Sequence, residues 1–482
     1  MKLGELIKNL NCEKLNVDEN LEITSLSLKD TDCISGSAFF CIKGNKNDGV
    51  DFIDNAIKNG AVVIITHKKV NNLSISQIVV KNVRKTLCVM ADRFYNTPHK
   101  RLKTVAIVGT NGKTTVCDLT AKLLNACGIK CGKIGTLGAE YEDIKVDTGF
   151  TTPDTPMLYS LLNDMANAGA NVVCMELSAH AIYYKKVDFR FDAIVFTNCT
   201  PEHLDFFKTF DEYRETKLSA FLHKYCKIAI VNGDDLLGKQ IACIRGRGTI
   251  MYGIKYPADV FAIDIKHDGE KINFLLNLFD ALYEIENSLI GDFNVYNMLA
   301  VSTVCALLGV KTKDVAKELS KLSPVRGRME KVCDKINIYI DYAHTPDGLE
   351  KSLMAIRNIK EKHKLICVFG CGGNRDGSKR KTMGEISGSL ADFTIITSDN
   401  PRFEDENKII KQIEEGVRLK THEYIAVRDR EQAIEYAVQM ANIGDYILIA
   451  GKGAEEYQEQ MGVFKPFSDS EVARRFEKNK YE

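Results

Sequence analysis

Residues 104–115, TVAIVGTNGKTT, have the types and spacing that bind nucleotide phosphates. Val105 to Val108 form an apolar, mostly β-branched run that predicts a buried parallel strand. After the loop, Lys113 and Thr114 open a predicted helix. In this arrangement the backbone N–H groups and the Lys113 ammonium bind phosphate, and a threonine hydroxyl binds Mg²⁺. We therefore predict an ATP site built from Gly109, Thr110, Asn111, Gly112, Lys113, Thr114 and Thr115.

The loop departs from the usual phosphate-loop spacing. That pattern has four residues between its glycines, whereas Gly109 and Gly112 enclose two. The alternative interpretation is an ordinary strand-to-helix turn with a solvated lysine. The apolar strand before the loop and the GKTT run after it favour the nucleotide site.

Two later strand ends carry groups suited to metal chemistry. The predicted strand 171–175 ends in Glu176, where a carboxylate beside a phosphate loop is placed to hold Mg²⁺. A helix N-cap or a surface acid is the alternative. The predicted strand 193–197 leads to His203 and Asp205. A lone histidine is more often structural, but its position at the same sheet edge as Glu176 favours function.

Three further polar residues remain open from the residues alone. Lys217 lies on a predicted helix at 210–222, and an ammonium cannot ligate Mg²⁺. Lys217 would therefore either contact phosphate or be a solvated side chain, and the residues alone favour the solvated side chain. Asn294 and Asn297 share one face of a helix that opens at residue 291 and continues through 308. They would bind a base or, by default, cap the helix.

The last part of the chain alternates strands and helices. Strands are predicted at 336–341, 364–369, 394–397 and 446–450, and helices at 347–359, 381–391, 406–415 and 430–440. This order predicts a doubly wound, mostly parallel sheet. Polar clusters follow its strands at Asp341, 370–380, 398–402 and 450–456. Because the carboxyl ends of parallel strands meet at one edge, these clusters are expected to build one site.

The predicted fold is α/β with three domains, at residues 1–98, 99–324 and 325–482. The first is a small α/β unit with strands at 38–42, 61–66 and 78–80 and helices at 51–59 and 84–95. Asn96-Thr97-Pro98 is its linker to the second. The GNKNDG segment at 44–49 is interpreted as a turn rather than a binding loop.

Composition narrows the class of protein. The 482 residues include 65 basic and 65 acidic side chains, so no basic field points to nucleic acid. The 15 cysteines are scattered without a C-x-x-C pair, which is typical of reduced thiols in a cytoplasmic protein. No apolar run reaches the ~20 residues that span a bilayer, and no secretory leader is recognised. We expect a cytoplasmic protein without membrane insertion.

The motifs GTNGKTT, MELSAH, EHLD, YRETK, GDFNVYN, RGRME, DYAHTPD and SDNPR occur in the order found in the Mur ligases. The chain resembles this family across all three domains, most weakly in the first. DYAHTPD and DNPR look like the members that add the third residue of the peptidoglycan stem. Folylpolyglutamate synthase shares the phosphate loop but differs at the third-domain Asp motif, and the D-alanyl-D-alanine-adding ligase carries YNANP where this chain has YAHTPD.

The resemblance implies a UDP-sugar-binding N-terminal domain, a central P-loop ATPase domain and a Rossmann-like C-terminal domain that binds the amino acid. It implies an ATP-dependent amide ligase that adds meso-diaminopimelate to UDP-N-acetylmuramoyl-L-alanyl-D-glutamate. ATP would phosphorylate the acceptor carboxylate, and the amine would attack the acyl phosphate. The implied cofactors are ATP and Mg²⁺, the partners are small molecules, and the enzyme is a monomer.

The resemblance also implies roles for single residues. The family lysine that matches Lys217 is carbamylated, which makes it an oxygen ligand and reverses the solvated interpretation. The implied Mg²⁺ ligands are Thr114, Glu176, His203 and carbamylated Lys217, and the implied catalytic residues are Lys113, Glu176, His203 and Lys217. Asn294 and Asn297 would lie near adenine. Arg328 and Asp341 would reach phosphate and ribose after domain closure.

The segment DNPR is, by resemblance, what distinguishes meso-diaminopimelate from L-lysine. Arg402 offers a bidentate fork to the distal carboxylate that lysine lacks, and Glu455 suits the distal ammonium. A surface arginine after an Asn-Pro turn is the alternative. The implied diaminopimelate-binding residues are Arg375, Asp399, Asn400, Pro401, Arg402, Gly451 and Glu455. The implied UDP-sugar-peptide-binding residues are Asp30, Thr151, Thr152, Ser178 and Lys186.

Several positions depart from the family pattern, mostly on the acceptor side. Lys29-Asp30-Thr31 replaces the family's Asp-Ser-Arg, and Phe150 replaces its Asn. Tyr184 and Lys186 replace the family's Gln and Arg. Ala454 replaces the histidine of GKGHE. One alternative is therefore a paralogue that joins an amino acid to another carboxylate acceptor. A second alternative is a regulatory protein that binds ATP without catalysis, although such a protein would not need all of the residues implied to bind Mg²⁺.

Overall fold

The computed structural model describes residues 1–44 and 47–481, which divide into two compact units. Residues 1–106, 129–194 and 219–227 form the first unit, and 107–128, 195–218 and 228–482 form the second. The turn predicted at 44–49 includes residues 45 and 46, which lie outside the described residues. Within the described ranges, no helix has the length and apolar character needed to cross a bilayer.

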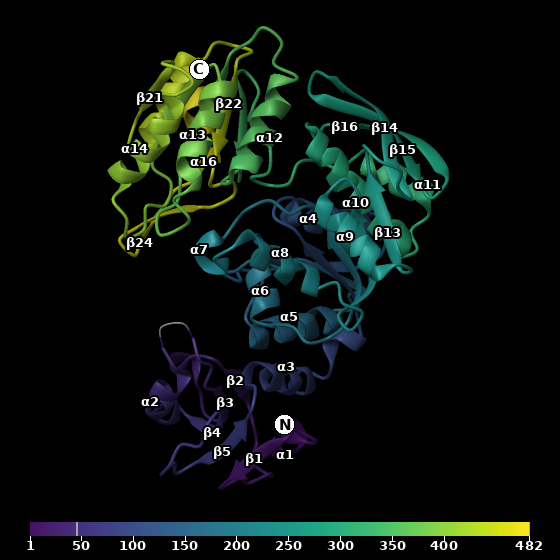
Figure 1. The fold of residues 1–482 in the computed structure, drawn as a ribbon, viewed down its shortest axis with the longest axis vertical. Coiled ribbons are helices and arrows are strands. Elements are labelled where there is room, and N and C mark those ends of the chain that lie inside the picture. Colours follow the sequence, from purple (N-terminus) through teal and green to yellow (C-terminus); the bar gives the residue numbers. More distant parts are fainter. Residues whose placement is uncertain (45–46, 482) are drawn as a thin grey trace. The chain divides into compact units, whose positions relative to one another are not determined.

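The N-terminal part of the first unit is built on a five-stranded sheet of order β1-β5-β4-β3-β2. Its strands are β1 (Cys12–Leu15), β2 (Ser25–Ser27), β3 (Ser37–Phe40), β4 (Ala61–Thr66) and β5 (Ser76–Val80). Only β1 runs antiparallel to its neighbour. Its helices are α1 (Leu3–Ile7), α2 (Ile53–Lys58) and α3 (Val83–Phe94) (Figure 1). Phe39 and Ile64 pack against Ile53 and Ala56 of α2 in one buried cluster.

Two details of this part differ from the prediction. The predicted helix at 51–59 begins as a 3₁₀ turn, Gly49–Phe52, and is α-helical only from Ile53 to Lys58. The strands β1 and β2 were not predicted, because CEKL and SLS are short and carry few apolar residues.

The rest of the first unit contains one parallel strand pair and a meander. The strands are β7 (Cys131–Gly135), β8 (Gly138–Tyr141), β9 (Ile144–Val146) and β10 (Val172–Glu176). β10 is parallel to β7, and β8 and β9 follow antiparallel. The helices are α5 (Thr155–Asn167) and α6 (Ala179–Tyr183). Three further strands, β6 (Lys103–Val108), β11 (Phe191–Phe196) and β12 (Cys226–Asn232), have residues in both units.

The second unit begins at Ile107 near the end of β6 and includes the phosphate loop, the helix that follows it and a mixed sheet. Its strands follow the order β12 (Cys226–Asn232), β13 (Thr249–Gly253), β14 (Val260–Asp268), β15 (Lys271–Leu278) and β16 (Ala281–Asn287). The first three are parallel and the last two antiparallel. The helices are α4 (Lys113–Ala126), α7 (Leu204–Phe207), α8 (Phe210–Ser219), α9 (Leu236–Arg245), α10 (Asp292–Leu307) and α11 (Thr312–Leu319). The helix predicted at 210–222 therefore ends three residues early.

The C-terminal part of the second unit has the predicted doubly wound sheet. Its order is β17-β18-β22-β19-β20-β21, and every strand except β17 is parallel to its neighbours. The strands are β17 (Glu330–Cys333), β18 (Asn337–Asp341), β19 (Leu365–Phe369), β20 (Phe393–Ile396), β21 (Tyr424–Ala426) and β22 (Tyr446–Ala450). All four predicted strands and all four predicted helices of this region are found within two residues of their expected bounds.

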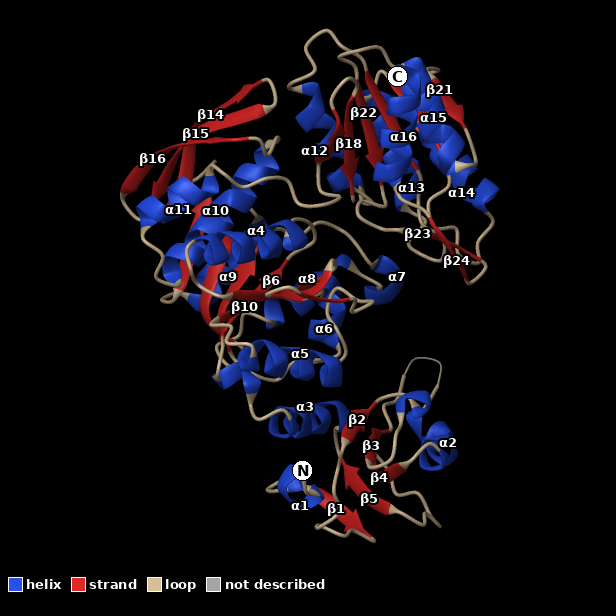
Figure 2. Cartoon of the chain, turned by 180° about the vertical axis from the view of Figure 1, so that it is seen from behind, coloured by secondary structure: helices blue, strands red, loops and turns tan. Residues whose placement is uncertain are grey.

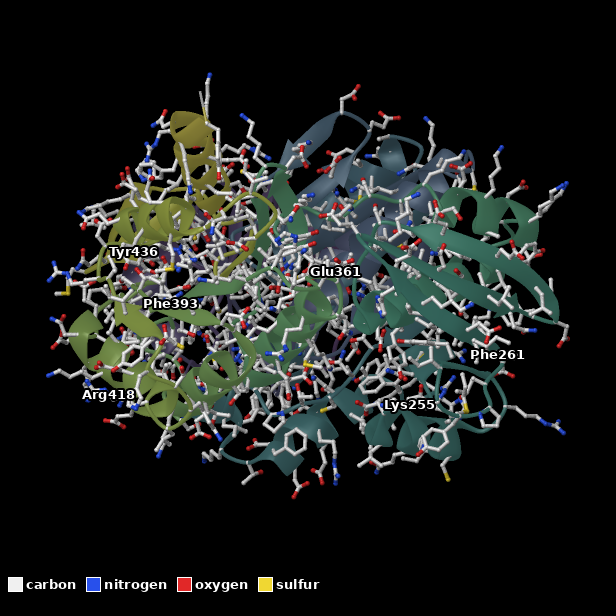
Figure 3. The ribbon with its side chains drawn as sticks, turned by 90° about the horizontal axis from the view of Figure 1, so that it is seen from above. Lys255, Phe261, Glu361, Phe393, Arg418 and Tyr436 are labelled. Atoms are coloured by element: carbon white, nitrogen blue, oxygen red, sulfur yellow. The ribbon has the colours of Figure 1, made fainter. Side chains whose placement is uncertain are left out.

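Helices cover both faces of this sheet, as Figure 2 shows. They are α12 (Pro346–Arg357), α13 (Lys379–Leu390), α14 (Glu406–Val417), α15 (Arg430–Met440) and α16 (Asp469–Tyr481). Leu353 and Ile413 belong to the buried cluster of one face, and Ile434 and Val472 to that of the other. In Figure 3, Phe393 of β20 lies between Tyr436 of α15 and Arg418 at the end of α14. The predicted doubly wound, mostly parallel α/β sheet is confirmed. A hairpin, β23 (Tyr457–Gln460) and β24 (Val463–Pro466), follows β22.

A buried ion pair ties the last two helices to the strand ends. Arg430 donates to both carboxylate oxygens of Asp469, at 2.7 and 2.8 Å, and both side chains are 0% exposed. The same guanidinium donates to the carbonyl oxygens of Ser398 and Ala450. Those carbonyls follow β20 and end β22, so the ion pair fixes the edge of the sheet where the polar clusters lie.

We expect Asp469→Asn to lower the free energy of unfolding by about 3–5 kcal/mol, because the charge of Arg430 would stay buried without its counter-ion. Chemical denaturation of the full chain measures this. Glu471→Gln, an exposed change on the same helix, is the matched control. Equal stability of the two variants would contradict the structural role of the pair.

Candidate active site

The phosphate loop is held in shape by the end of the neighbouring strand. A Cβ at Gly109 would lie 1.8 Å from Thr197 Oγ1, so only glycine fits there. Thr197 Oγ1 donates to the Asn111 carbonyl at 2.6 Å, and the Asn198 side chain accepts from the Asn111 N–H at 2.9 Å. Lys113 Nζ donates to the carbonyls of Gly109 and Thr110. The ammonium therefore lies over the loop, at the start of α4.

Lys217 is buried directly beside this loop. Its side chain, from α8, is 1% exposed, so the solvated interpretation was wrong. Lys217 Nζ donates to Thr110 Oγ1 at 2.7 Å, lies 4.0 Å from Cys199 Sγ and stands 4.0 Å from the ring centroid of Tyr213. Burial lowers the pKa of Lys217 to about 7, and the charge on Lys113 acts in the same direction. A large share of this amine is therefore uncharged near neutral pH.

A carboxylate that was not predicted, Glu202, completes this group. Glu202 Oε2 accepts from the Tyr213 hydroxyl at 3.2 Å, and Tyr213 and Thr110 share a hydrogen bond of 3.2 Å. Glu202 Oε1 lies 3.1 Å from His344 Nε2 and 3.7 Å from His203 Nε2. Burial alone would raise the pKa of Glu202, but the His344 hydrogen bond and nearby positive charge hold it well below its usual range.

Arg328 reaches the phosphate loop, whereas Asp341 supports the chain around it. Arg328 Nη2 donates to Thr114 Oγ1 at 2.9 Å, and its guanidinium lies 4.2 Å from the Tyr342 ring centroid. Asp341 accepts from the N–H groups of Met329 and Ala343 and from the Ser352 hydroxyl. Burial raises the pKa of Asp341, and Arg328 opposes that rise. The two residues predicted to bind phosphate and ribose thus lie close to each other.

The two asparagines of α10 are not helix caps, so that default was wrong. Gly291 is the N-cap of α10, and Asn294 donates instead to the Ile290 carbonyl at 2.8 Å. Asn297 donates to Asn294 Oδ1 at 3.0 Å, and a Cβ at Gly112 would lie 2.7 Å from Asn297 Oδ1. Asn297 therefore packs against the phosphate loop at Gly112.

In the first unit, Glu176 lies at the centre of the residues expected to bind the acceptor. It is 1% exposed and accepts from Thr136 N–H at 2.7 Å and from Thr136 Oγ1 at 3.2 Å. The N-cap of α6 is Ser178, so Glu176 is neither a helix cap nor a surface acid. Thr152 Oγ1 donates to the Glu176 carbonyl at 2.8 Å and hydrogen-bonds with Ser178.

The other residues of the expected acceptor set divide into two places. Thr151 shares a 3.1 Å hydrogen bond with Thr136, and Lys186 donates to the Thr152 carbonyl at 3.1 Å. Both therefore belong to the Glu176 cluster. Asp30 lies on a 3₁₀ turn in the N-terminal part, where its carbonyl accepts from Asn59 at 2.9 Å.

The residues expected to bind the amino acid gather at the ends of β20 and β22. Asn400 donates to Glu455 Oε2 at 2.8 Å, and a Cβ at Gly451 would lie 2.6 Å from Asp399 Oδ2. Arg402, after Pro401, is 21% exposed and donates to the Gly373 carbonyl at 3.0 Å, so it is not a free surface arginine. Burial alone would raise the pKa of Asp399, but Lys452 and Arg430 lower it. Arg375, in the loop after β19, is exposed.

Two basic residues that support these loops were missed. Lys452 is 0% exposed and donates to Asn400 Oδ1 and Glu455 Oε2, at 3.0 and 2.9 Å. Arg380 is also buried and donates to both oxygens of Glu404, at 2.6 and 2.8 Å. Both lie inside polar clusters that the sequence singled out, but nothing in the sequence separates a supporting basic residue from a ligand-binding one.

The Arg380–Glu404 pair makes stability depend on acid pH. The hydrogen bond from Arg380 lowers the pKa of Glu404 from 4.5 to about 2, so its stabilisation is complete above pH 4.5 and is lost as pH falls toward 2. We expect Glu404→Gln to cost about 1–3 kcal/mol of unfolding free energy at neutral pH. Urea denaturation of both proteins should show this difference unchanged above pH 4.5 and narrower at about pH 3.5. A difference that widens on acidification would contradict the assignment.

Comparisons with known proteins match the Mur ligase family in three segments of the chain. Residues 22–95 match the Mur ligase family catalytic domain, 107–305 the Mur ligase middle domain and 327–453 the Mur ligase glutamate ligase domain. UDP-N-acetylmuramoyl-L-alanyl-D-glutamate–2,6-diaminopimelate ligase 1 of Clostridium acetobutylicum is 39% identical and covers 99% of both chains. The correspondingly named ligase of Aquifex aeolicus is 38% identical and covers 94% of this chain and 93% of its own.

Solved structures show the same fold. A structure of a UDP-N-acetylmuramoyl-L-alanyl-D-glutamate–2,6-diaminopimelate ligase has a TM-score of 0.70 and 27% identity, and covers 100% of this chain and 99% of its own. The MurF ligase of Thermotoga maritima in complex with ADP has a TM-score of 0.63 and 20% identity, with 96% and 99% covered. At 20% identity, the similarity to this MurF ligase concerns the fold alone.

Proposed function

We propose a specific reaction for this chain, which belongs to the Mur ligase family and is an ATP-dependent, ADP-forming ligase. It joins meso-diaminopimelate to UDP-N-acetylmuramoyl-L-alanyl-D-glutamate in peptidoglycan precursor synthesis. The observation that carries this proposal is the Arg402 cluster, in which a guanidinium, an amide and carboxylates meet at the ends of β20 and β22. From the family resemblance we further propose a monomer acting in the cytoplasm.

The reaction proceeds through an acyl phosphate. The acceptor carboxylate attacks the γ-phosphorus of ATP, and ADP leaves. The amine of the diamino acid then attacks the acyl carbon, phosphate leaves, and the nitrogen loses a proton as the amide forms. Phosphoryl transfer needs positioning and charge neutralisation more than covalent help. The loop N–H groups, Lys113 and Arg328 would supply these to the phosphates, and Asn294 and Asn297 would lie near adenine.

The residues around the loop fit a bound Mg²⁺. The test is the buried amine of Lys217, whose hydrogen-bond partner is a neutral hydroxyl and whose pKa is lowered by burial to about 7. The nitrogen of an uncharged amine attacks CO₂ and releases a proton to solvent, and the resulting carbamate replaces an unsuitable cation with anionic oxygen ligands. Thr114, His203 and the Lys217 carbamate, all in the second unit, would hold the ion. When bound, Mg²⁺ neutralises phosphate charge.

A second function is favoured by the acceptor-side substitutions. Lys186 Nζ lies 2.8 Å from Asp154, and the guanidinium of Arg84 stacks 4.5 Å from the Tyr184 ring centroid. The side chains that replace the family's Gln and Arg are thus engaged with the protein itself. A paralogue that uses the same ATP and amino-acid chemistry on another carboxylate acceptor would carry such changes.

Phosphate release by the purified protein separates the two functions. We expect ATP turnover only when UDP-N-acetylmuramoyl-L-alanyl-D-glutamate and meso-diaminopimelate are both present, because phosphate leaves only after the amine attacks. L-Lysine in place of diaminopimelate is the control for the amino acid. Turnover with a different acceptor but not with this one would establish the paralogue.

We expect Lys217→Ala to lower kcat by about a hundredfold or more, because the carbamate oxygens are lost from the charge-stabilising set. Formate or acetate should restore part of the activity by supplying a substitute carboxylate. Lys224→Ala, an exposed change beyond the same helix, is the control. A folded, ATP-binding Lys217→Ala protein that small carboxylates never rescue would contradict the oxygen-ligand role.

A further inference from the structure

Arg402 is already paired with a carboxylate, Glu459 of β23. Arg402 Nε lies 3.1 Å from Glu459 Oε2, and the two side chains are 21% and 17% exposed. A Cβ at Gly372 would lie 2.9 Å from Arg402 Nη1, so the guanidinium lies against a loop with no room for side chains. Arg402 is thus not a lone positive charge among the residues proposed to bind the amino acid.

The backbone holds Glu459 firmly beside the segment 399–402. Glu459 N–H donates to Asn400 Oδ1 at 2.9 Å, and Arg402 N–H donates to the Glu459 carbonyl at 3.1 Å. Met461 N–H donates to the Arg402 carbonyl at 2.7 Å, and Gln458 donates to the Asp399 carbonyl at 2.8 Å. These bonds keep Arg402 at φ +52°, a left-handed conformation that costs a non-glycine residue energy. The hairpin β23–β24, shown in Figure 2, therefore fixes the pair in place.

Glu455, to which the resemblance assigned the distal ammonium, is already neutralised by neighbouring side chains. Glu455 Oε2 accepts from the buried ammonium of Lys452 at 2.9 Å and from Asn400 at 2.8 Å. Asp399 is likewise held charged by Lys452 and Arg430. Glu459 is the carboxylate that pairs with Arg402 itself, and it is partly open to solvent.

We infer that Glu459 is a specificity-determining residue that binds the distal ammonium of the added diamino acid while Arg402 binds its distal carboxylate. A lone arginine would attract any second carboxylate, whereas a guanidinium and a carboxylate side by side match a zwitterionic terminus, whose two charges are one carbon apart. The inference rests on the proposed function, since it presumes that the amino acid ends in such a group.

The test compares meso-diaminopimelate with 2-aminoheptanedioate, which lacks only the distal amine. The kcat/KM of each is measured in the wild type, Glu459→Gln and the control Glu456→Gln, whose exposed carboxylate lies on the same segment. Where the analogue is not turned over, its inhibition constant replaces kcat/KM. We expect Glu459→Gln to reduce the preference for diaminopimelate about tenfold or more, since one charge-assisted hydrogen bond is lost with one substrate only. The control should keep the wild-type preference.

Equal losses with both substrates would overturn the inference, because Glu459 would then only support Arg402. An unchanged preference in Glu459→Gln would overturn it too. Should that variant fail to fold, Glu459→Asp keeps the charge but shortens its reach and is expected to lose part of the preference; full retention would count against the inference. A wild-type protein that does not use diaminopimelate refutes the proposed function, whereas wild-type activity with an unchanged preference refutes this inference alone.

Discussion

The cost of removing an ammonium from water shapes the centre of this enzyme. Lys217 is buried between Thr110, Cys199 and the ring of Tyr213, without a carboxylate as its direct hydrogen-bond partner. Such burial favours the uncharged amine, and an uncharged amine is the form that reacts with CO₂. The same hydroxyl that receives its hydrogen bond belongs to the phosphate loop. The nucleotide loop and the proposed ligand are thereby built as one packed group.

A second constraint comes from the sheet, because the carboxyl ends of its parallel strands all lie at the same edge. In the C-terminal sheet, β18, β20 and β22 deliver Asp341, the segment 399–402 and the segment 451–455 to that edge. The Arg430–Asp469 ion pair holds the ends of β20 and β22 together. Lys452 and Arg380 hydrogen-bond to residues of the loops that follow them. A site that must tell one amino acid from another depends on such rigid support, since a small displacement would misplace the reacting amine.

These two constraints explain what the sequence could predict. The doubly wound sheet follows from apolar runs of four to six residues that alternate with periodic helices, and its polar strand ends follow from the parallel arrangement. The burial of Lys217 could not be predicted, because α8 is a mostly polar helix and its buried face is set by contacts distant in sequence. Glu202 and His344 lie in the motifs EHLD and DYAHTPD, but these segments are 142 residues apart and nothing in either one predicts their pairing. Short polar strands such as β1 and the hairpin strands β23 and β24 carry too few apolar residues to be recognised.

The most direct test of this account is carbon-13 NMR of the intact protein equilibrated with [¹³C]bicarbonate at neutral pH. The buried, partly uncharged amine predicts a protein-bound carbamate resonance in the wild type that is absent from Lys217→Ala and retained in Lys224→Ala. A wild-type spectrum without that resonance, recorded on folded and ATP-binding protein, would contradict the role given to Lys217.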